Sequence, residues 1–277
     1  MIMLVLFCLP LESLYGASMD HFSGVQQRLA ADGFDRASLQ AIYSDPRIAF
    51  ETRGVSMYFV HSEGKLNYDQ FLEPEPIRKA RSYMQTHAEI LAGAEREYGV
   101  DRQVITAILL VETRLGSYVG NRLVINTFST MAALSDQGVR DDLWQRIQAS
   151  TTLTRRSFDA KAQRKSEWAY GELKAFLHYP GRYGIDPLSV KGSYAGALGY
   201  CQFLPSNILK LGRDGSGDGQ LDLFDHADSI MSVANYLKHH GWQAGLTEEK
   251  AARVIYSYNH SRYYVRTVLK IAQALQG

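Results

Sequence analysis

Glu112 is the residue whose surroundings in the sequence best suit an acid. It follows the apolar run Val104–Val111, which predicts a helix through the core, and Gly116 comes shortly after it. A helix C-terminus disfavours a carboxylate, and apolar surroundings disfavour its ionised form further. We therefore expect a raised pKa, which lets a general acid hold its proton near neutral pH. The alternative is a solvated glutamate paired with Arg114 or Arg122.

A glycine-rich segment, Lys191–Ser206, alternates small residues with polar or aromatic ones. Its glycines allow close backbone approach or positive φ angles, and Ser193 and Gln202 carry groups that hydrogen-bond ligands. This pattern is typical of a binding loop. A loop that only packs helices together is the alternative.

The segment Asp214–Asp225 fits the twelve-residue calcium loop of EF-hands. Oxygen-bearing side chains stand at positions one, three and five, glycine at six and a carboxylate at twelve, and Gln220 offers its backbone carbonyl. Asp225 replaces the usual bidentate glutamate, which favours weak, structural binding. A solvated turn is the alternative. A single such loop does not favour a calcium sensor, because sensors usually pair two.

The charge balance argues against nucleic acid as a partner. The 277 residues include 30 Lys and Arg against 29 Asp and Glu, a net charge of +1. Proteins that bind phosphates through charge usually show a clustered basic face. The densest basic stretch, at Lys161, Arg164 and Lys165, is explained by a solvated helix face.

The first residues are apolar and then turn small and polar, which is typical of a secretory signal peptide. We expect a signal at residues 1–18, cleaved after Ala17, and one domain at residues 19–277, outside the cytoplasm in the periplasm. The run is too short to span a bilayer, which takes about twenty apolar residues. It lacks a basic start, so a buried N-terminal segment is the alternative. Loss of Cys8 would leave Cys201 alone, as a buried thiol.

Apolar residues recur mostly at helical spacing, which predicts a mainly α fold of the α+β class. Residues 47–72 are the least regular and favour a small lobe with a hairpin or an extended arm. No role is assigned to residues 135–163. The expected helices are two short ones in 22–44, then Pro76–Tyr98, Gln103–Leu115, Thr127–Leu134, Asp141–Ala149, Lys165–His178, Pro205–Leu211, Ala227–His240 and Glu248–Ala274, the last interrupted near Asn259.

Several long motifs in this order resemble the lytic murein transglycosylase B family. They are VETRLG at 111–116, DPLSVKGSYAGALGYCQFLPS at 186–206, DGSGDGQLDLFD at 214–225, SVANYLKHHGW at 232–242 and YNHS at 258–261. The resemblance covers most of 22–274. It implies a monomeric, lysozyme-like helical catalytic domain whose cleft binds peptidoglycan glycan strands.

The resemblance also assigns roles to single positions, and it implies structural calcium but no cofactor for catalysis. Glu112 matches the family's only catalytic acid/base. The positions that match residues of the sugar cleft are Ser193, Gln202, Tyr236, Tyr258 and Asn259. Those that match the calcium loop are Asp214, Ser216, Asp218, Gln220 and Asp225. Cys201 stands where the family usually has glycine, and near Tyr68 the match fades.

One carboxylate limits the chemistry. Most glycosidases use two, but the other acids near the matched motifs belong to the calcium loop. The resemblance implies instead that Glu112 protonates the leaving oxygen and then accepts a proton from the muramic acid C6 hydroxyl, which closes a 1,6-anhydro ring. A hydrolytic muramidase and a non-catalytic peptidoglycan-binding protein are the alternatives.

Overall fold

The computed structural model describes residues 20–60 and 67–276, and within these ranges the chain is mainly helical, as the sequence predicts. The helices are α1 Ser23–Ala31, α2 Arg36–Tyr43, α3 Thr52–Val60, α4 Pro74–Thr86, α5 Ala88–Tyr98, α6 Arg102–Thr113, α7 Val124–Ala133, α8 Gln137–Ile147, α9 Arg155–Tyr183, α10 Pro205–Leu211, α11 His226–His239, α12 Glu248–Tyr258 and α13 Arg262–Ala274. A 3₁₀ turn, η2, covers Asp69–Leu72, and two short strands are β1 Arg122–Leu123 and β2 Lys191–Gly192.

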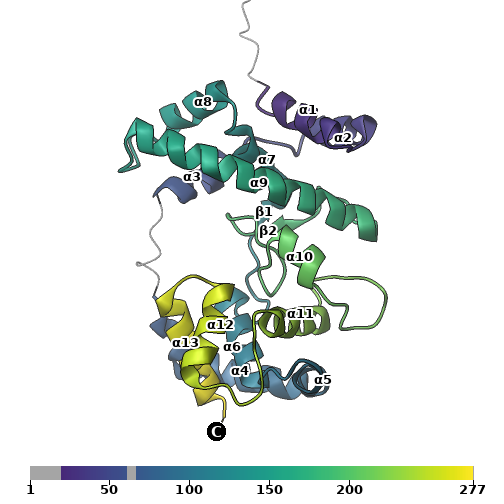
Figure 1. Ribbon diagram of the computed structural model, residues 1–277, viewed down its shortest axis with the longest axis vertical. Helices are drawn as coiled ribbons and strands as arrows, with labels where there is room; N and C mark the ends of the chain where they lie inside the picture. Colours follow the sequence, from purple (N-terminus) through teal and green to yellow (C-terminus); the bar gives the residue numbers. More distant parts are fainter. Residues whose placement is uncertain (1–19, 61–66, 277) are drawn as a thin grey trace, which may run out of the picture.

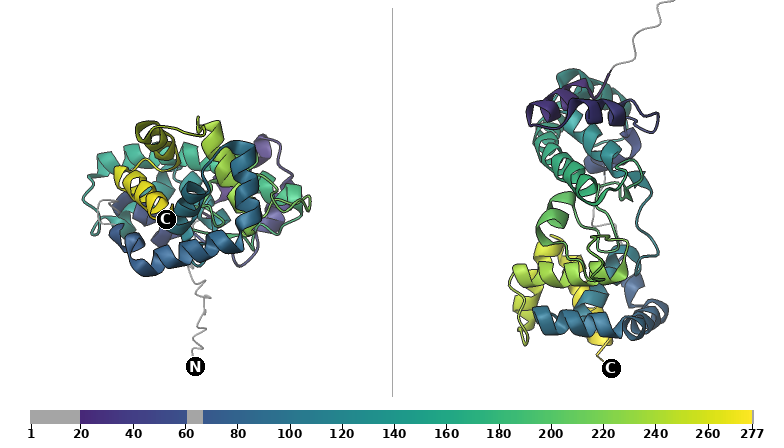
Figure 2. Two further views of the ribbon diagram at one scale, coloured as in Figure 1. Left: turned by 90° about the horizontal axis from the view of Figure 1, so that it is seen from below. Right: turned by 90° about the vertical axis from the view of Figure 1, so that its right-hand side faces the viewer.

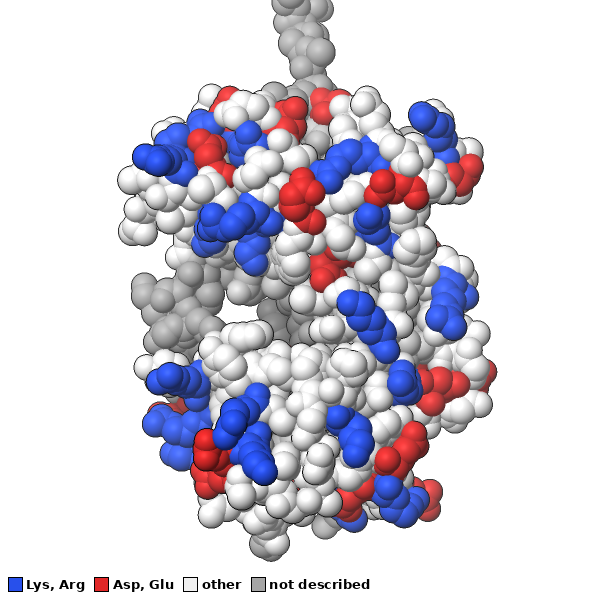
Figure 3. Space-filling model, in the orientation of Figure 1, with Lys and Arg blue, Asp and Glu red and all other residues white. Residues whose placement is uncertain are grey.

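The helices form two lobes (Figure 1). The α9 lobe contains α1 to α3 and α7 to α9, with α7 packed along α9, and the α6 lobe contains α4 to α6 and α11 to α13, with α6 packed on α13. The two strands and α10 lie between the lobes, and the molecule is longest in the direction that joins them (Figure 2). On the face drawn in Figure 3 the surface is hollowed between the lobes, and acidic and basic side chains are interspersed.

Helix α6 runs through the core of its lobe because it is apolar on every side. Each residue from Val104 to Leu110 is buried. The helix ends when Arg114 and Leu115 adopt positive φ angles of 52° and 61°, and the Leu115 amide closes the turn on the Leu109 carbonyl at 3.0 Å. Glu112 therefore stands in the last turn, where α6 leaves the core.

The glycine-rich loop is joined to the segment after α6 by backbone contact. Strands β1 and β2 pair antiparallel, with Arg122 opposite Gly192. A Cβ atom on Gly120 would lie 2.2 Å from the Gly192 carbonyl oxygen, so only glycine fits there. A Cβ atom on Gly199, which has a φ of 75°, would lie 2.5 Å from the Leu223 carbonyl oxygen. The glycine-rich loop is therefore held close to the segment after α6 at one place and to the backbone near Leu223 at another.

Three segments differ from the sequence prediction. Residues 52–60 form helix α3 in place of the expected hairpin or arm, since Val55 and Phe59 are buried one helical turn apart. The single helix expected over Pro76–Tyr98 is two, because the chain bends at His87, whose ring packs against those of Tyr83 and His226.

Helix α9 begins ten residues before the expected start at Lys165. Its first turns bury Phe158 and Ala162, and one large apolar residue is too few to give an apolar periodicity. Residues 135–163, which had no assigned role, thus form α8 and the start of α9.

No described helix has both the length and the apolarity needed to cross a membrane. The expected signal peptide at residues 1–18 lies outside the described residues.

Gly199→Ala tests the close approach of the loop. Its Cβ atom would lie 2.3 Å from the Leu223 Cβ and 2.5 Å from the Leu223 carbonyl oxygen. Because neither atom is at the end of a flexible side chain, we expect the free energy of unfolding to fall by about 2–4 kcal/mol, from overpacking and the positive φ. The matched control is Gly171→Ala, where nothing lies within 4 Å of the new atom and about 0.5–1 kcal/mol should be gained. Urea unfolding measures both, and equal midpoints would contradict the packing argument.

Candidate active site

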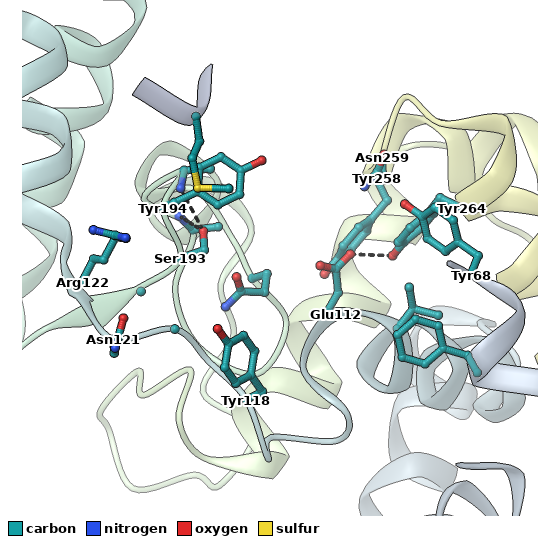
Figure 4. Close-up of a pocket in the computed structure, with 18 of the residues that line it drawn as sticks. Tyr68, Glu112, Tyr118, Asn121, Arg122, Ser193, Tyr194, Tyr258, Asn259 and Tyr264 are labelled. Atoms are coloured by element: carbon teal, nitrogen blue, oxygen red, sulfur yellow. Dashed lines mark hydrogen bonds between the residues drawn. The ribbon is translucent and has the colours of Figure 1, made fainter. Parts of the chain in front are cut away.

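A cleft of about 850 Å³ lies between the two lobes. One wall comes from the α6 lobe and carries Glu112, Tyr258 and Tyr264, while the opposite wall comes from the glycine-rich loop, β1 and α3 (Figure 4). The lining is rich in tyrosines and amides. Among the described residues that line it, Glu112 is the only acid.

Glu112 is half-buried and accepts a hydrogen bond from the Tyr264 hydroxyl, with 2.7 Å between Oη and Oε1 (Figure 4). Tyr264 is 1% exposed. Its burial, and next the negative charge of Glu112, raise the pKa of Tyr264 well above its ordinary value. The hydroxyl therefore keeps its proton and always donates. It fixes the Oε1 oxygen of the carboxylate in the cleft wall.

The pairing of Glu112 with a neighbouring arginine is not what the structure shows. Arg114 donates to Gln70 Oε1 at 2.6 Å, and Arg122 donates to Glu51 Oε1 at 2.6 Å. Both guanidinium groups thus have other partners.

Tyr258 stacks parallel to Tyr264, with 6.4 Å between ring centroids and 7° between ring planes. Its hydroxyl donates to the Cys201 carbonyl oxygen at 2.6 Å, which fastens the end of α12 to the glycine-rich loop. Asn259 follows α12 directly and lines the cleft beside it. Cys201 is buried, as expected. The two stacked tyrosines have different partners, the Glu112 carboxylate for Tyr264 and a backbone carbonyl for Tyr258.

Ser193 and Gln202 lie on the opposite wall, as the sequence predicts. The Ser193 hydroxyl oxygen accepts the amides of Ala195 and Ala197 at 3.3 and 3.2 Å, and Gln202 Nε2 donates to the Gly199 carbonyl at 2.9 Å. The hydroxyl hydrogen of Ser193 and the amide oxygen of Gln202 have no partner among the described residues. Both can bind a ligand in the cleft.

Backbone strain gathers beside the cleft. The non-glycine residues with positive φ in the described ranges are Arg114, Leu115 and Gln202, the last at 51°. Such conformations cost about 1–3 kcal/mol each and cluster at functional sites. Arg114 and Leu115 come two and three residues after Glu112, and Gln202 lines the opposite wall.

Tyr236 does not line the cleft, in contrast to the sequence prediction. It is 6% exposed on α11 and packs behind Tyr258, with 4.8 Å between the ring centroids. Its hydroxyl donates to the Ser257 carbonyl oxygen at 2.6 Å. Tyr236 supports the wall from behind through its ring contact with Tyr258 and its bond to the end of α12.

Comparison with known proteins agrees with this geometry. The family model described as the transglycosylase SLT domain matches residues 17–251, most of the chain. The chain belongs to the transglycosylase SLT domain family. It is 34% identical over 176 residues to the membrane-bound lytic murein transglycosylase B of Escherichia coli strain K12, a match that covers 64% of this chain but 41% of that relative's length.

Solved structures confirm the lysozyme-like helical fold for this SLT-domain protein. The soluble lytic transglycosylase SltB1 of Pseudomonas aeruginosa superposes with a TM-score of 0.74 at 24% identity, over 91% of this chain and 97% of that one. The E. coli lytic transglycosylase Slt35, in complex with calcium, superposes with a TM-score of 0.72 at 25% identity, over 93% of both chains.

The expected calcium loop follows α10 in this SLT-domain protein. Asp214 accepts the amides of Gly217 and Gly219 at 2.6 and 2.8 Å, so its carboxylate organises the loop. Asp225 caps α11 by accepting the amides of Ala227 and Asp228. Within the described ranges, no three His, Cys, Asp or Glu side chains come close enough together to hold a metal ion. The loop oxygens are of the kind that calcium takes, but calcium binding stays a prediction.

A buried carboxylate beneath this loop lies outside the twelve-residue pattern. Asp228 is 1% exposed and accepts the amides of Gly215, Ser216 and Asp222 at 2.7 to 3.0 Å. It stands three residues beyond Asp225, in the first turn of α11. The loop is therefore shaped by carboxylates at both of its ends.

Several cleft residues of this SLT-domain protein were not found from the sequence. They are Met57, Tyr58, Asn67, Tyr68, Gln70, Tyr118, Asn121, Arg122, Tyr194 and Tyr264. Tyr264 lies six residues after Tyr258, and this spacing was the only available signal. Tyr194 comes from the glycine-rich loop. The others come from α3, from η2 and the two residues before it, and from the segment after α6, whose positions depend on how the two lobes meet.

Proposed function

We propose that this protein is a peptidoglycan lytic transglycosylase, which cleaves the β-1,4 bond between N-acetylmuramic acid and N-acetylglucosamine without water. The observation that carries the proposal is a single carboxylate, Glu112, held by a buried tyrosine in the wall of a cleft large enough for sugars. Membership of the SLT domain family and the named activity of the E. coli relative support it.

Among the described residues that line the cleft there is no second acid, and this favours the route over paired-carboxylate chemistry. Two-carboxylate glycosidases place their acids about 5–9.5 Å apart, across the scissile bond. In the described part of the cleft lining, no Asp or Glu stands opposite Glu112. A single acid suffices if the substrate supplies the other groups, and muramic acid carries both an N-acetyl group and a C6 hydroxyl.

Glu112 acts first as acid and then as base. Its carboxyl group donates a proton to the glycosidic oxygen as the bond to C1 breaks, while the N-acetyl carbonyl oxygen of the muramic acid stabilises the positive charge at C1. The resulting carboxylate removes the proton of the C6 hydroxyl, whose oxygen attacks C1 and closes a 1,6-anhydro ring. Glu112 ends in its starting protonation state, and no water is consumed. Tyr264 holds Oε1 throughout, so the other oxygen keeps one orientation.

The remaining cleft residues position the strand. Ser193, Gln202 and Asn259 offer polar groups to the sugar amides and hydroxyls, and the tyrosines offer rings to sugar faces. Orientation is the largest gain open to such an enzyme, because the attacking C6 hydroxyl belongs to the reacting sugar itself. Since this substrate lies outside the cytoplasmic membrane, we place the protein in the periplasm, acting as a monomer.

We propose further that the loop Asp214–Asp225 binds calcium in a structural role. The donors would be the side chains of Asp214, Ser216, Asp218 and Asp225 and the Gln220 carbonyl. The crystallised E. coli lytic transglycosylase of the same fold, which was in complex with calcium, supports the proposal. The ion would steady the start of α11 and takes no part in the proton transfers.

Glu112→Gln tests the acid/base role. The amide cannot donate and reclaim the proton, so kcat on purified sacculi should fall by at least about 10²–10⁴-fold. The circular dichroism spectrum and melting temperature should stay those of the wild type, because glutamine can still accept from Tyr264. Mass spectrometry of the wild-type products should show muramic acid ends lighter by one water than hydrolysed ends.

Two other results of this experiment would contradict the proposal, and each would identify a different alternative function. Reducing muramic acid ends would identify a hydrolytic muramidase. Binding of sacculi without release of fragments, unchanged by the substitution, would identify a non-catalytic wall-binding protein.

Tyr264→Phe tests the hold on Glu112, with Tyr258→Phe as its matched control. Hydrogen bonds to charged groups are worth about 1.5–3 kcal/mol, so loss of the Tyr264 hydroxyl should lower kcat at least about tenfold while KM changes little. Loss of the Tyr258 hydroxyl removes a bond to a backbone carbonyl and should lower stability by about 1 kcal/mol with a smaller change in kcat. Equal kcat losses would show that Tyr264 has no special role toward Glu112.

Calcium titration tests the loop. At 10 mM calcium, a site in the millimolar class should add about 1.4 kcal/mol to the stability of the wild type, and raise its melting temperature by about 3–5 °C. Asp214→Ala should remove this response, and magnesium should not reproduce it. A wild-type melting temperature indifferent to calcium would contradict the site, and loss of all turnover in folded, calcium-free protein would contradict a purely structural role.

A further inference from the structure

Arg122 lies on the cleft wall opposite Glu112 (Figure 4). Among the described residues that line the cleft, it is the only lysine or arginine. The mechanism proposed above leaves this cation unused. Its position on β1, paired to the glycine-rich loop, makes it part of the rigid frame of the cleft.

The guanidinium is held in place on one side and open on the other. Its Nη1 donates to Glu51 Oε1 at 2.6 Å, and the side chain passes over Gly54, where a Cβ atom would lie only 3.1–3.3 Å from it. No other hydrogen-bond acceptor among the described residues contacts Arg122, and its side chain is 24% exposed. A guanidinium has five N–H donors, so most of them remain available in a fixed orientation.

Further positive charge lies behind this wall. Lys161 Nζ donates to the Tyr58 carbonyl oxygen, and Lys165 Nζ lies 5.1 Å from the centre of the Tyr58 ring. Tyr58 itself lines the cleft and donates to the Ala195 carbonyl oxygen at 2.9 Å. Two acids offset these charges, since Glu51 pairs with Arg122 and the charge of Glu172 also acts on Tyr58. The three cations Arg122, Lys161 and Lys165 still outnumber them, which favours an anion at this wall.

In the proposed substrate, the anion must come from muramic acid. N-acetylglucosamine carries no charge. Muramic acid carries a lactyl group on O3, which ends in a free carboxylate on strands without peptides and is linked to the stem peptide, with carboxylates of its own, on strands that carry them. A preoriented guanidinium binds a carboxylate well, through two parallel hydrogen bonds.

We propose that Arg122 binds a carboxylate carried by the lactyl substituent of muramic acid, and that this contact sets the register of the glycan strand. The inference rests on the proposed function. The two sugars alternate, so a strand shifted by one sugar presents the wrong β-1,4 bond to Glu112. An anchor that only muramic acid can satisfy selects the productive register.

The experiment measures binding in the inactive Glu112→Gln protein, by calorimetry, with three ligands. Chitotetraose has no carboxylate, a peptide-free tetrasaccharide of alternating N-acetylglucosamine and N-acetylmuramic acid has free lactyl carboxylates, and the same tetrasaccharide with stem peptides has peptide carboxylates. Adding Arg122→Gln should raise the Kd of a carboxylate-bearing ligand about 10- to 100-fold, the usual strength of a charge-assisted bond, and leave that of chitotetraose unchanged.

Two control variants separate recognition from structural support. Glu51→Gln keeps an acceptor oxygen for Gly54 but removes the negative charge, so recognition by Arg122 predicts equal or tighter binding of the carboxylate ligand. A merely structural ion pair predicts that Glu51→Gln weakens binding as Arg122→Gln does. Arg164→Gln removes one exposed charge from the same lobe and should change no Kd.

The set of ligands whose affinity falls with Arg122→Gln tests the proposal and identifies the carboxylate that is bound. Weakening of only the peptide-free ligand assigns the lactyl carboxylate, and weakening of only the stem-bearing ligand assigns the peptide. Equal weakening of all three ligands, or none, overturns the role of Arg122. Failure of the wild type to release anhydro ends from sacculi, with binding differences intact, would instead overturn the proposed function alone.

Discussion

The hydrogen bond from Tyr264 to Glu112 is the interaction on which the rest of the site depends. A half-buried carboxylate needs a partner, and a lysine or arginine in that place would hold it ionised and remove its use as an acid. A buried tyrosine hydroxyl orients the carboxylate without adding a positive charge. The hydrogen bond between Tyr264 and Glu112 requires α13 to pack along α6. The two residues come from these two helices and lie 152 residues apart in the chain.

The second constraint is the approach of the glycine-rich loop to the segment after α6. Gly120 and Gly192 bring two backbones into contact, and that contact fixes where the wall with Ser193 and Gln202 stands relative to Glu112. Tyr258 closes the same arrangement from the other side, through its bond to the Cys201 carbonyl. The width of the cleft is thus set by backbone and buried hydroxyl contacts rather than by flexible side chains.

How far the sequence predicts this structure depends on whether the signal is local. The apolar run of α6, the interruption near Asn259 and the helix at Pro205–Leu211 are local patterns, and each was found. Glu112, Ser193, Gln202, Tyr258 and Asn259 line one cleft, as the motifs indicated. What failed depends on contacts between distant segments. Helix α3 was missed, and Tyr68 and Arg122 became visible only once the lobes were placed.

Tyr236 and Asp228 show why a motif alone does not assign a role. Tyr236 belongs to a motif of the family, but its side chain packs behind Tyr258 and is not among the residues that line the cleft. Asp228 falls outside the twelve-residue pattern, yet it is the buried carboxylate that accepts three loop amides, while Asp225 caps a helix. The chemical type and spacing of residues in the sequence identify candidates for a functional role. The packing of the helix or loop that carries the residue then decides its role. The residue can line the cleft, cap a helix or hold a loop backbone in place.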